Sequence, residues 1–228
     1  MISGVLLDGA AQLGITLGER ELQQLMALLD ELDIWNQRMN LTAIRERPQQ
    51  ITKHLLDSLS LQPLLRGSRI LDVGTGAGFP GMPLAVVNPA RHFTLLDGTA
   101  KKLKFIDHVV QLLGLSNVQT VHARAEGFRP AVRFDTVLAR AVGPVNQFIE
   151  RAGHLCVGGG RLLAMKGRHP QAELERLPNG WKLAAVHPVK VPALLGVAIG
   201  ICLLGVVGIG IYPAPWVDMA LRVASTLF

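Results

Sequence analysis

The stretch RILDVGTGAGFPG, residues 69–81, is the part of the sequence that best indicates the fold. A short apolar run typical of a buried strand leads directly into four glycines, which fall within the eight residues 74–81. Glycine tolerates positive φ angles and allows the backbone to approach a ligand closely. Open α/β sheets bind ligands at the carboxyl ends of their strands, where such a loop lies. The stretch therefore predicts a ligand-binding loop, with a tight turn packed on the strand as the plainer alternative.

After residue 69, apolar runs of strand length alternate with helical patterns. The predicted strands are RILDV (69–73), HFTLLD (92–97), VQTVH (118–122), FDTVLA (134–139), GRLLAM (160–165) and, less regular, WKLAAV (181–186). The predicted helices cover residues 83–87, 100–113, 144–155 and 171–177. This alternation predicts an α/β fold with a mostly parallel sheet and helices on both faces.

The first 66 residues follow a helical pattern instead. Apolar residues recur at helical spacing over residues 22–39, and Asn40 is expected to end that helix. The segment QQITKHLLDSLSLQPLL (49–65) predicts a further helix, which Pro63 interrupts late. The chain is thus divided into a helical part (1–66), an α/β domain (67–192) and an atypical tail (193–228).

Charge and cysteine content narrow the classes of function. The 228 residues are 49% hydrophobic, enough for a packed core, and carry a formal net charge of +6. This charge suggests an anionic partner such as nucleic acid or a membrane surface. Cys156 and Cys202 lie far apart, without a CxxC or Cys/His cluster, so we expect no metal site and no disulfide. The N-terminus lacks the basic start and long apolar run of a signal peptide, so a cytoplasmic protein is expected.

The glycine spacing fits two classes of cofactor. Gly76, Gly78 and Gly81 match the G-x-G-x-x-G pattern of dinucleotide-binding proteins. Gly74, Gly76 and Gly78 match G-x-G-x-G, the loop of S-adenosylmethionine enzymes. Because both loops rely on the same backbone properties, the glycines alone do not separate the two classes.

Residues beside the loop favour the sulfonium cofactor. Asp72 precedes the first glycine and could receive an ammonium group, directly or through water, but would be badly placed beside a pyrophosphate. Asp97 ends the second predicted strand, where a carboxylate can accept both ribose hydroxyls of either cofactor. In VHARAEGF (121–128), Ala125 and Glu126 could frame the adenine edge, with an ordinary polar loop as the alternative.

Short motifs follow one another in a recognisable order. They are NLTAIR (40–45), HLLDS (54–58), DVGTGAGFPG (72–81), TLLD (94–97) with KKLKF (101–105), LARAV (138–142) and MKG (165–167). Over about residues 10–195 this set resembles the RsmG family, also called GidB, of bacterial 16S ribosomal RNA guanine-N7 methyltransferases. The resemblance implies a Rossmann-like, S-adenosylmethionine-dependent methyltransferase sheet with an N-terminal helical extension.

The resemblance also implies roles for particular residues. Those implied to bind S-adenosylmethionine are Gly74, Gly76, Gly78 and Phe79 in the loop, Asp97 at the ribose, Ala125 and Glu126 at the adenine, and Arg140 at the cofactor or active site. For Arg140, a structural salt bridge with Asp72 or Asp135 is the alternative.

Further motif residues are expected outside the cofactor pocket. By resemblance, His54, Asp57 and Lys166 lie near the RNA face, whereas Asn40 and Thr42 fix the junction between the helical part and the sheet. Guanine N7 carries a lone pair and no proton, so methyl transfer to it needs alignment but no general base. Arg140 and Lys166 are therefore expected to position substrate or cofactor and not to carry protons.

The basic residues predict how RNA is held. Lys101, Lys102 and Lys104 begin a predicted helix beside the cofactor loop and are expected to bind RNA phosphates, although a solvated helix face is the alternative. Arg45, Arg47 and Lys53 could add phosphate contacts from the helical part. The implied partner is 16S ribosomal RNA or the small ribosomal subunit, at a hairpin near the decoding site where N7 is accessible. A monomer is expected.

The tail departs from the family. Relatives continue beyond residue 194 through a charged segment into a last strand with an associated arginine, whereas this chain has no charged residue from Val191 to Val217. The tail resembles the C-terminal membrane segment of NADH-quinone oxidoreductase subunit N, which suggests a foreign end. Two alternatives are a genuine membrane anchor and an apolar run that folds back to supply a replacement strand and helix.

Two other functions stay open from the sequence. GAGFPG could serve a nicotinamide-dependent oxidoreductase, although no hydride-transfer constellation is recognisable. The apolar tail could belong to a membrane-tethered protein without enzymatic activity.

Overall fold

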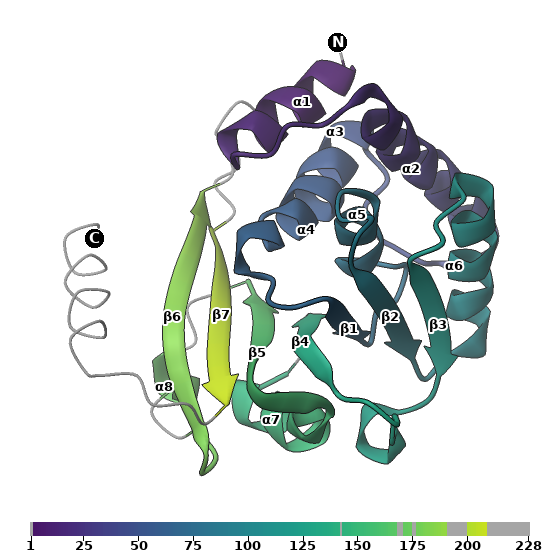
Figure 1. The fold of residues 1–228 in the computed structure, drawn as a ribbon. Coiled ribbons are helices and arrows are strands. Elements are labelled where there is room, and N and C mark those ends of the chain that lie inside the picture. The colour runs from purple at the N-terminus through teal and green to yellow at the C-terminus, as the bar shows by residue number, and fades with distance from the viewer. Residues whose placement is uncertain (1, 142, 168–170, 175–176, 191–199, 209–228) are drawn as a thin grey trace.

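The computed structural model describes residues 2–141, 143–167, 171–174, 177–190 and 200–208. Its centre is a seven-stranded sheet in the order β3-β2-β1-β4-β5-β7-β6 (Figure 1). The strands are β1 (Arg69–Val73), β2 (His92–Asp97), β3 (Val118–His122), β4 (Phe134–Arg140), β5 (Cys156–Lys166), β6 (Trp181–Lys190) and β7 (Gly200–Gly208). Strands β1 to β5 are parallel, and the strand order reverses between β1 and β4, where open sheets of this kind bind ligands.

Helices surround this sheet. The α-helices are α1 (Ile2–Gln12), α2 (Glu19–Met39), α3 (Arg47–Gln50), α4 (Asp57–Leu59), α5 (Gly81–Val86), α6 (Ala100–Leu113), α7 (Val145–Ala152) and α8 (Gln171–Leu174). The shorter elements are the π-helix η1 (Ile51–Leu56) and the 3₁₀ turns η2 (Gln62–Leu64), η3 (Ala125–Gly127) and η4 (Gly153–Leu155).

The central strands β1, β2 and β4 are buried on both faces of the sheet, which explains why they are mostly apolar. Successive side chains along a strand point to opposite faces. Ile70 accordingly joins the core built with α1, α2, α5 and α6, whereas Leu71 joins the core built with α7. Leu138 and Val137 divide between the same two cores. The predicted α/β fold with helices on both faces is confirmed.

The predicted boundaries agree with most of these elements. Strands β1, β2 and β3 have the predicted bounds, as does α6, while β4 extends one residue further to Arg140. Strand β5 begins at Cys156, four residues earlier than predicted, because its glycines are accommodated in the strand. The helix predicted over 144–155 is divided into α7 and the 3₁₀ turn η4.

The N-terminal part is helical as predicted. The buried leucines of α2 follow its apolar stripe, and Asn40 ends the helix in the left-handed conformation with φ of 48°. The segment predicted as one helix over 49–65 consists of α3, η1, α4 and η2. The wide π-turn η1 is the feature that the pattern did not indicate, and such turns occur frequently at functional sites.

The described part of the tail is a strand. Strand β7 lies antiparallel between β5 and β6, with Lys166 opposite Cys202 and Lys190 opposite Gly200 (Figure 1). The apolar run thus supplies the last strand of the sheet at these nine residues, as in the fold-back alternative, and does not form a helix there. The helix expected in that alternative, and the rest of the segment compared with subunit N, fall outside the described residues. Within the described ranges, no helix combines the length and apolar character needed to span a bilayer.

Candidate active site

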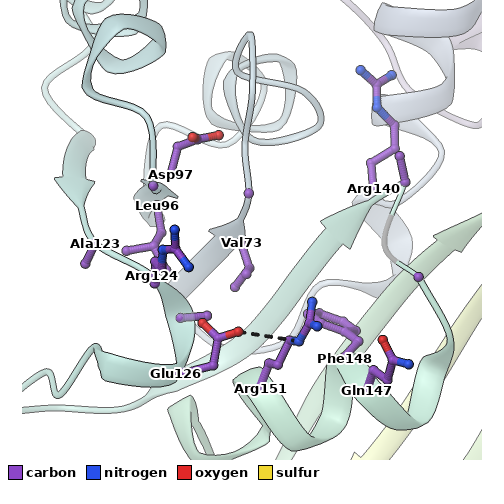
Figure 2. Close-up of a pocket in the computed structure, with 15 residues that line it drawn as sticks. Val73, Leu96, Asp97, Ala123, Arg124, Glu126, Arg140, Gln147, Phe148 and Arg151 are labelled. Carbon is purple, nitrogen blue, oxygen red and sulfur yellow. Dashed lines mark ion pairs between the residues drawn. The ribbon is translucent and has the colours of Figure 1, made fainter.

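A large cavity of about 380 Å³ opens at the carboxyl ends of the parallel strands (Figure 2). Its walls are Val73, Gly74, Leu96, Asp97, Gly98, Ala123, Arg124, Ala125, Glu126, Arg140, Ala141, Gly143, Gln147, Phe148 and Arg151. We call this space the large cavity. It brings together five predicted residues that lie at or just after the ends of four strands, which are Gly74, Asp97, Ala125, Glu126 and Arg140.

The glycine loop is held open toward this cavity. Gly74 and Gly76 have φ angles of 67° and 62°, which glycine adopts without strain. The amides of Gly74 and Thr75 donate to the Leu96 carbonyl, at 2.8 and 3.0 Å. A Cβ built on Gly74 would meet no atom within 4 Å, so the space beside this backbone is free for a ligand.

Asp97 is fixed by the backbone around it. Its Oδ2 accepts a hydrogen bond from the Gly76 amide at 3.0 Å, and its Oδ1 accepts one from the Thr99 amide at 2.8 Å. Each carboxylate oxygen keeps a second lone-pair direction for another donor. A preoriented carboxylate on a cavity wall suits a pair of ribose hydroxyls, as the sequence predicted.

Asp72 lies elsewhere than expected. Its side chain is fully buried and is not among the residues lining the large cavity. Its Oδ2 accepts hydrogen bonds from the Thr75 hydroxyl at 2.7 Å and the Gly81 amide at 2.8 Å, and burial raises the pKa of the carboxyl to about 6. In this geometry Asp72 fastens the two ends of the glycine loop to each other, and its contact with a ligand ammonium, directly or through water, stays a prediction.

Three other predicted loop residues also lie outside the large cavity, and of these Gly76 lines a smaller cavity that is described below. Gly78, with φ of 86°, packs so closely on α5 that a Cβ there would lie 2.6 Å from Cγ of Met82. Phe79 is buried and contributes to a different space, described below. Gly78 and Phe79 thus shape the loop, and their contact with the cofactor stays a prediction.

The far end of the large cavity carries charged residues from η3 and α7. Ala125 and Glu126 lie in η3, and the Glu126 carboxylate pairs with Arg151 at 3.4 Å, the contact drawn in Figure 2. Phe148 of α7 adds an aromatic wall. An apolar slot with a polar rim of this kind can take a planar base.

A small cavity of about 160 Å³ lies beside the large one. Its walls are Leu41, Thr42, His54, Gly74, Thr75, Gly76, Ala77, Phe79, Arg140 and Ala141. We call this space the small cavity. Gly74, Arg140 and Ala141 line both spaces, so a group bound in one lies directly beside a group bound in the other.

Arg140 holds the wall between the two cavities. Its Nη1 donates to the Lys53 carbonyl at 2.9 Å and lies 3.4 Å from Nδ1 of His54. Its guanidinium carbon lies 5.4 Å from the centre of the Phe79 ring, a cation–π geometry. Figure 2 shows this side chain on the opposite side of the pocket from Asp97.

Arg140 forms no salt bridge with Asp72 or Asp135, the two partners considered from the sequence. Asp135 pairs with Arg69 at 3.3 Å, near the start of β1. The charges of Asp57 and Asp72 still act on Arg140 through space, but burial is the larger influence and lowers the pKa of the guanidinium. Arg140 is thus held mainly by a carbonyl and an aromatic ring.

His54 and Asp57 are buried beside Arg140, and neither is exposed at an RNA-binding surface. The His54 ring stacks on Phe79 with 4.6 Å between ring centres, and burial together with Arg140 lowers its pKa to about 4. His54 lines the small cavity, so of the predicted RNA-face residues it is the one placed next to the cofactor loop. Its place near the RNA face stays a prediction, which the small cavity and not the outer surface would have to provide.

Lys166 is engaged within the protein. Its ammonium donates to both carboxylate oxygens of Glu173, at 2.9 and 3.0 Å, and to the Gly143 carbonyl at 2.9 Å. Glu173 in turn accepts from the Val145 amide at 2.7 Å. This network holds the turn after β4 against the large cavity, so Lys166 acts on the site through the backbone.

The lysines of α6 are arranged as the phosphate-binding prediction requires. Lys101 and Lys104 are exposed and Lys102 is half-buried, on the first turn and a half of the helix that follows Asp97. By contrast Arg47, named from the sequence as a further phosphate contact, pairs with Asp30 and Asp33 of α2.

Sequence reasoning missed several lining residues. Thr42, assigned to the junction between the helical part and the sheet, is fastened to α2, because its backbone exchanges two hydrogen bonds with the Asn36 side chain at 2.9 Å each. Its hydroxyl side also lines the small cavity, which the pattern did not indicate. Ala141, with φ of 56°, and Gln147 carry no signal that a single sequence reveals, because only the folded turn after β4 brings them to the site.

The Asp57 carboxyl predicts how stability depends on pH. Burial raises its pKa from 3.8 to about 7 against the opposing charge of Arg140. Between these values the folded state keeps a proton that the unfolded state releases, so this group lowers the free energy of unfolding as pH rises. Asp57→Asn removes the titration, and its stability relative to the wild type should rise by on the order of 2–4 kcal/mol across that window. Urea unfolding from about pH 4 to about pH 8 measures the difference.

Asp135→Asn is the matched control. Although burial opposes it, hydrogen bonds from Arg69 and Ser68 lower the pKa of Asp135 below 3.8. Its stabilising effect is therefore complete above that pH and lost only as pH falls through the lowered pKa. The difference between this variant and the wild type should be constant where that of Asp57→Asn changes. A constant difference for Asp57→Asn as well would contradict the effect assigned to burial.

Comparison with known proteins places this site in a family. Residues 21–199 match the family described as GidB, rRNA small subunit methyltransferase G. A ribosomal RNA small subunit methyltransferase G from Nitrosococcus oceani is 46% identical over 190 residues, which cover 83% of this chain and 89% of that protein. The protein of the same description from Saccharophagus degradans is 46% identical over 187 residues, covering 82% and 84%.

Solved structures agree on the fold. An S-adenosylmethionine-dependent O-methyltransferase from Thermotoga maritima has a TM-score of 0.51 and 15% identity, covering 82% of this chain and 73% of that one. TrmN from Thermus thermophilus has a TM-score of 0.51 and 22% identity, covering 76% and 53%. These likenesses confirm the Rossmann-like methyltransferase fold. Because the family match and the identities extend over most of the chain, this protein belongs to the RsmG (GidB) family of ribosomal RNA small subunit methyltransferases.

Proposed function

We propose that this protein transfers a methyl group from S-adenosylmethionine to N7 of a guanine in 16S ribosomal RNA. The observation that carries the proposal is the meeting of two cavities at Gly74, Arg140 and Ala141. The large cavity has the open backbone at Gly74, the fixed carboxylate of Asp97 and the apolar slot that S-adenosylmethionine needs. The small cavity is open to a second group directly beside it.

Each side of the reaction has residues suited to it. When bound, S-adenosylmethionine supplies an electrophilic methyl carbon on a cationic sulfur. Asp97 would accept the ribose hydroxyls, and the walls at Ala125 and Phe148 would hold the adenine. Arg140, fixed from both sides, would set the distance between the two bound groups, which is what an uncharged nucleophile such as N7 requires. No residue needs to remove a proton.

The RNA is expected to approach over α6. Lys101, Lys102 and Lys104 lie on the helix that begins just after Asp97, so phosphates bound there would place a base near the small cavity. Binding through such contacts weakens as salt is raised. The wider proposal is a cytoplasmic, monomeric enzyme with the residue 67–192 unit as its catalytic domain.

Transfer of a labelled methyl group tests the proposal. The full chain is incubated with S-adenosylmethionine labelled in its methyl group and with small ribosomal subunits that lack the modification. We expect one methyl per subunit, located at guanine N7 by strand cleavage specific for 7-methylguanine. Asp97→Ala should lose most of the transfer because the ribose loses its acceptor, whereas Asp107→Ala, exposed on α6, should retain it.

Two results would refute the proposed function. One is the absence of transfer to guanine N7 with folded protein that binds the cofactor. The other is tight binding of a nicotinamide dinucleotide without binding of S-adenosylmethionine, measured by calorimetry, which would favour the oxidoreductase alternative.

A further inference from the structure

Three polar side chains form a line along the wall of the small cavity. Nη1 of Arg140 lies 3.4 Å from Nδ1 of His54, and Nε2 of His54 lies 3.0 Å from Oγ1 of Thr42. Thr42 and His54 both line the cavity, and they come from the loop after α2 and from the π-helix η1. The line therefore joins the sheet to the helical part beside the small cavity, where the base that accepts the methyl group would lie.

The direction of the hydrogen bonds in this line is determined by Arg140. A guanidinium has N–H donors and no acceptor. From this contact we assign to the neutral His54 ring the tautomer with its lone pair at Nδ1, toward Arg140, and its proton at Nε2. Nε2–H then donates to Oγ1 of Thr42. Stacking of the ring on Phe79 keeps it in this orientation.

This leaves the Thr42 hydroxyl able only to donate. Its oxygen accepts from His54 Nε2–H and, at 3.1 Å, from the Ile44 amide. A hydroxyl has two acceptor positions and one donor hydrogen, so both acceptor positions are used. Only the hydroxyl hydrogen of Thr42 is then left to bond with a ligand in the small cavity.

An obligate donor distinguishes the two purines. On the edge that carries N7, guanine presents a second acceptor, O6, whereas adenine presents the N6 amino donor. We infer that the Thr42 hydroxyl donates to O6 of the acceptor guanine and so selects guanine over adenine in the small cavity. The inference rests on the proposed function and adds a specificity-determining residue to it.

A substrate that lacks O6 tests the inference. Small subunits are reconstituted with RNA that carries either guanine or 2-aminopurine, which retains N7 without O6, at the target position. Wild-type kcat/KM should be about 10- to 100-fold lower on 2-aminopurine, the range of one directional base contact. Thr42→Ser keeps the hydroxyl and should keep this ratio. Thr42→Val should lose a similar factor in kcat/KM on guanine. Because it lacks the contact with O6, its kcat/KM values on guanine and on 2-aminopurine should be nearly equal.

The ratio is measured within each variant, so loss of folded protein does not change it. A ratio for Thr42→Val equal to that of the wild type, or equal rates for the wild type on both bases, would overturn the inference while leaving methyl transfer intact. No transfer by the wild type to guanine N7 would refute the proposed function itself. The two failures are therefore distinguishable.

Discussion

Gly74→Ala is expected to weaken binding of S-adenosylmethionine about 100-fold while the protein stays folded, because a methyl group would enter the space a ligand needs. The built Cβ meets no protein atom within 4 Å, so it clashes with nothing in the fold. It points into space shared by both cavities, beside backbone that a ligand must approach. The only cost to folding is that of an L-residue at a φ of 67°, about 1–2 kcal/mol.

Gly114→Ala provides the matched control. Gly114 ends α6 with φ of 62° and also has no atom within 4 Å of a built Cβ. Both variants should lose the same small amount of stability, measured by urea unfolding, and only Gly74→Ala should lose affinity in calorimetry. Equal cofactor affinities for the two variants would show that the ligand does not lie against Gly74.

Gly81→Ala should behave in a third way. A Cβ there would lie 2.2 Å from Cδ2 of Leu95 and 2.8 Å from Oδ2 of Asp72, both in the core. Such overpacking typically costs about 1–3 kcal/mol, and the contact with Asp72 adds loss of the loop fastening. The three glycine-to-alanine variants thus report separately on ligand contact at Gly74, backbone strain at Gly114 and core packing at Gly81.

The contrast among these glycines explains how far the sequence could predict the site. The apolar runs located β1 and β2 because these strands are buried on both faces, and the spaced apolar residues of α6 located that helix because one of its faces packs on the core. Asp97 lies beside the glycine loop, as the sequence predicted, because it ends the strand next to that loop, and its contact with a ribose stays a prediction. Spacing could not tell Gly74, which faces the cavity, from Gly78 and Gly81, which pack on the core.

What the sequence could not reveal depends on contacts between distant segments. Arg140 and His54 are 86 residues apart and meet because the π-helix η1 turns the Lys53 carbonyl and the His54 ring toward the end of β4. Asp72 was assigned to the ligand because strand ends face the cavity, yet its carboxylate turns back to Thr75 and Gly81. Lys166 was placed near the RNA face from its motif, MKG, which does not reveal that Glu173, seven residues later, pairs with it.

Arg140→Met is expected to lower kcat about 100- to 1000-fold, the range seen when a preorganised cationic or hydrogen-bonding group is removed from a reacting site. Methionine keeps an apolar stem of similar length over Phe79 but cannot donate to the Lys53 carbonyl or to His54. The line from Arg140 to Thr42 then loses the group that determines its direction. Single-turnover methyl transfer to small subunits measures the effect, at saturating S-adenosylmethionine so that cofactor affinity does not contribute.

Arg140→Met should also lower the free energy of unfolding, through a lost hydrogen bond and through a changed pKa of Asp57. Only the second effect depends on pH. Removing the donor takes a charge-assisted hydrogen bond from the Lys53 carbonyl, at about 1.5–3 kcal/mol. It also removes the positive charge that lowers the pKa of Asp57, so that pKa should rise above about 7 and the stability lost on raising pH should extend to higher pH. Arg69→Met, which removes an ion pair from a half-exposed site, should cost less than about 1 kcal/mol and leave kcat unchanged. Arg140→Met with wild-type turnover and only the stability loss would mean that Arg140 braces the wall between the cavities without acting on the groups bound there.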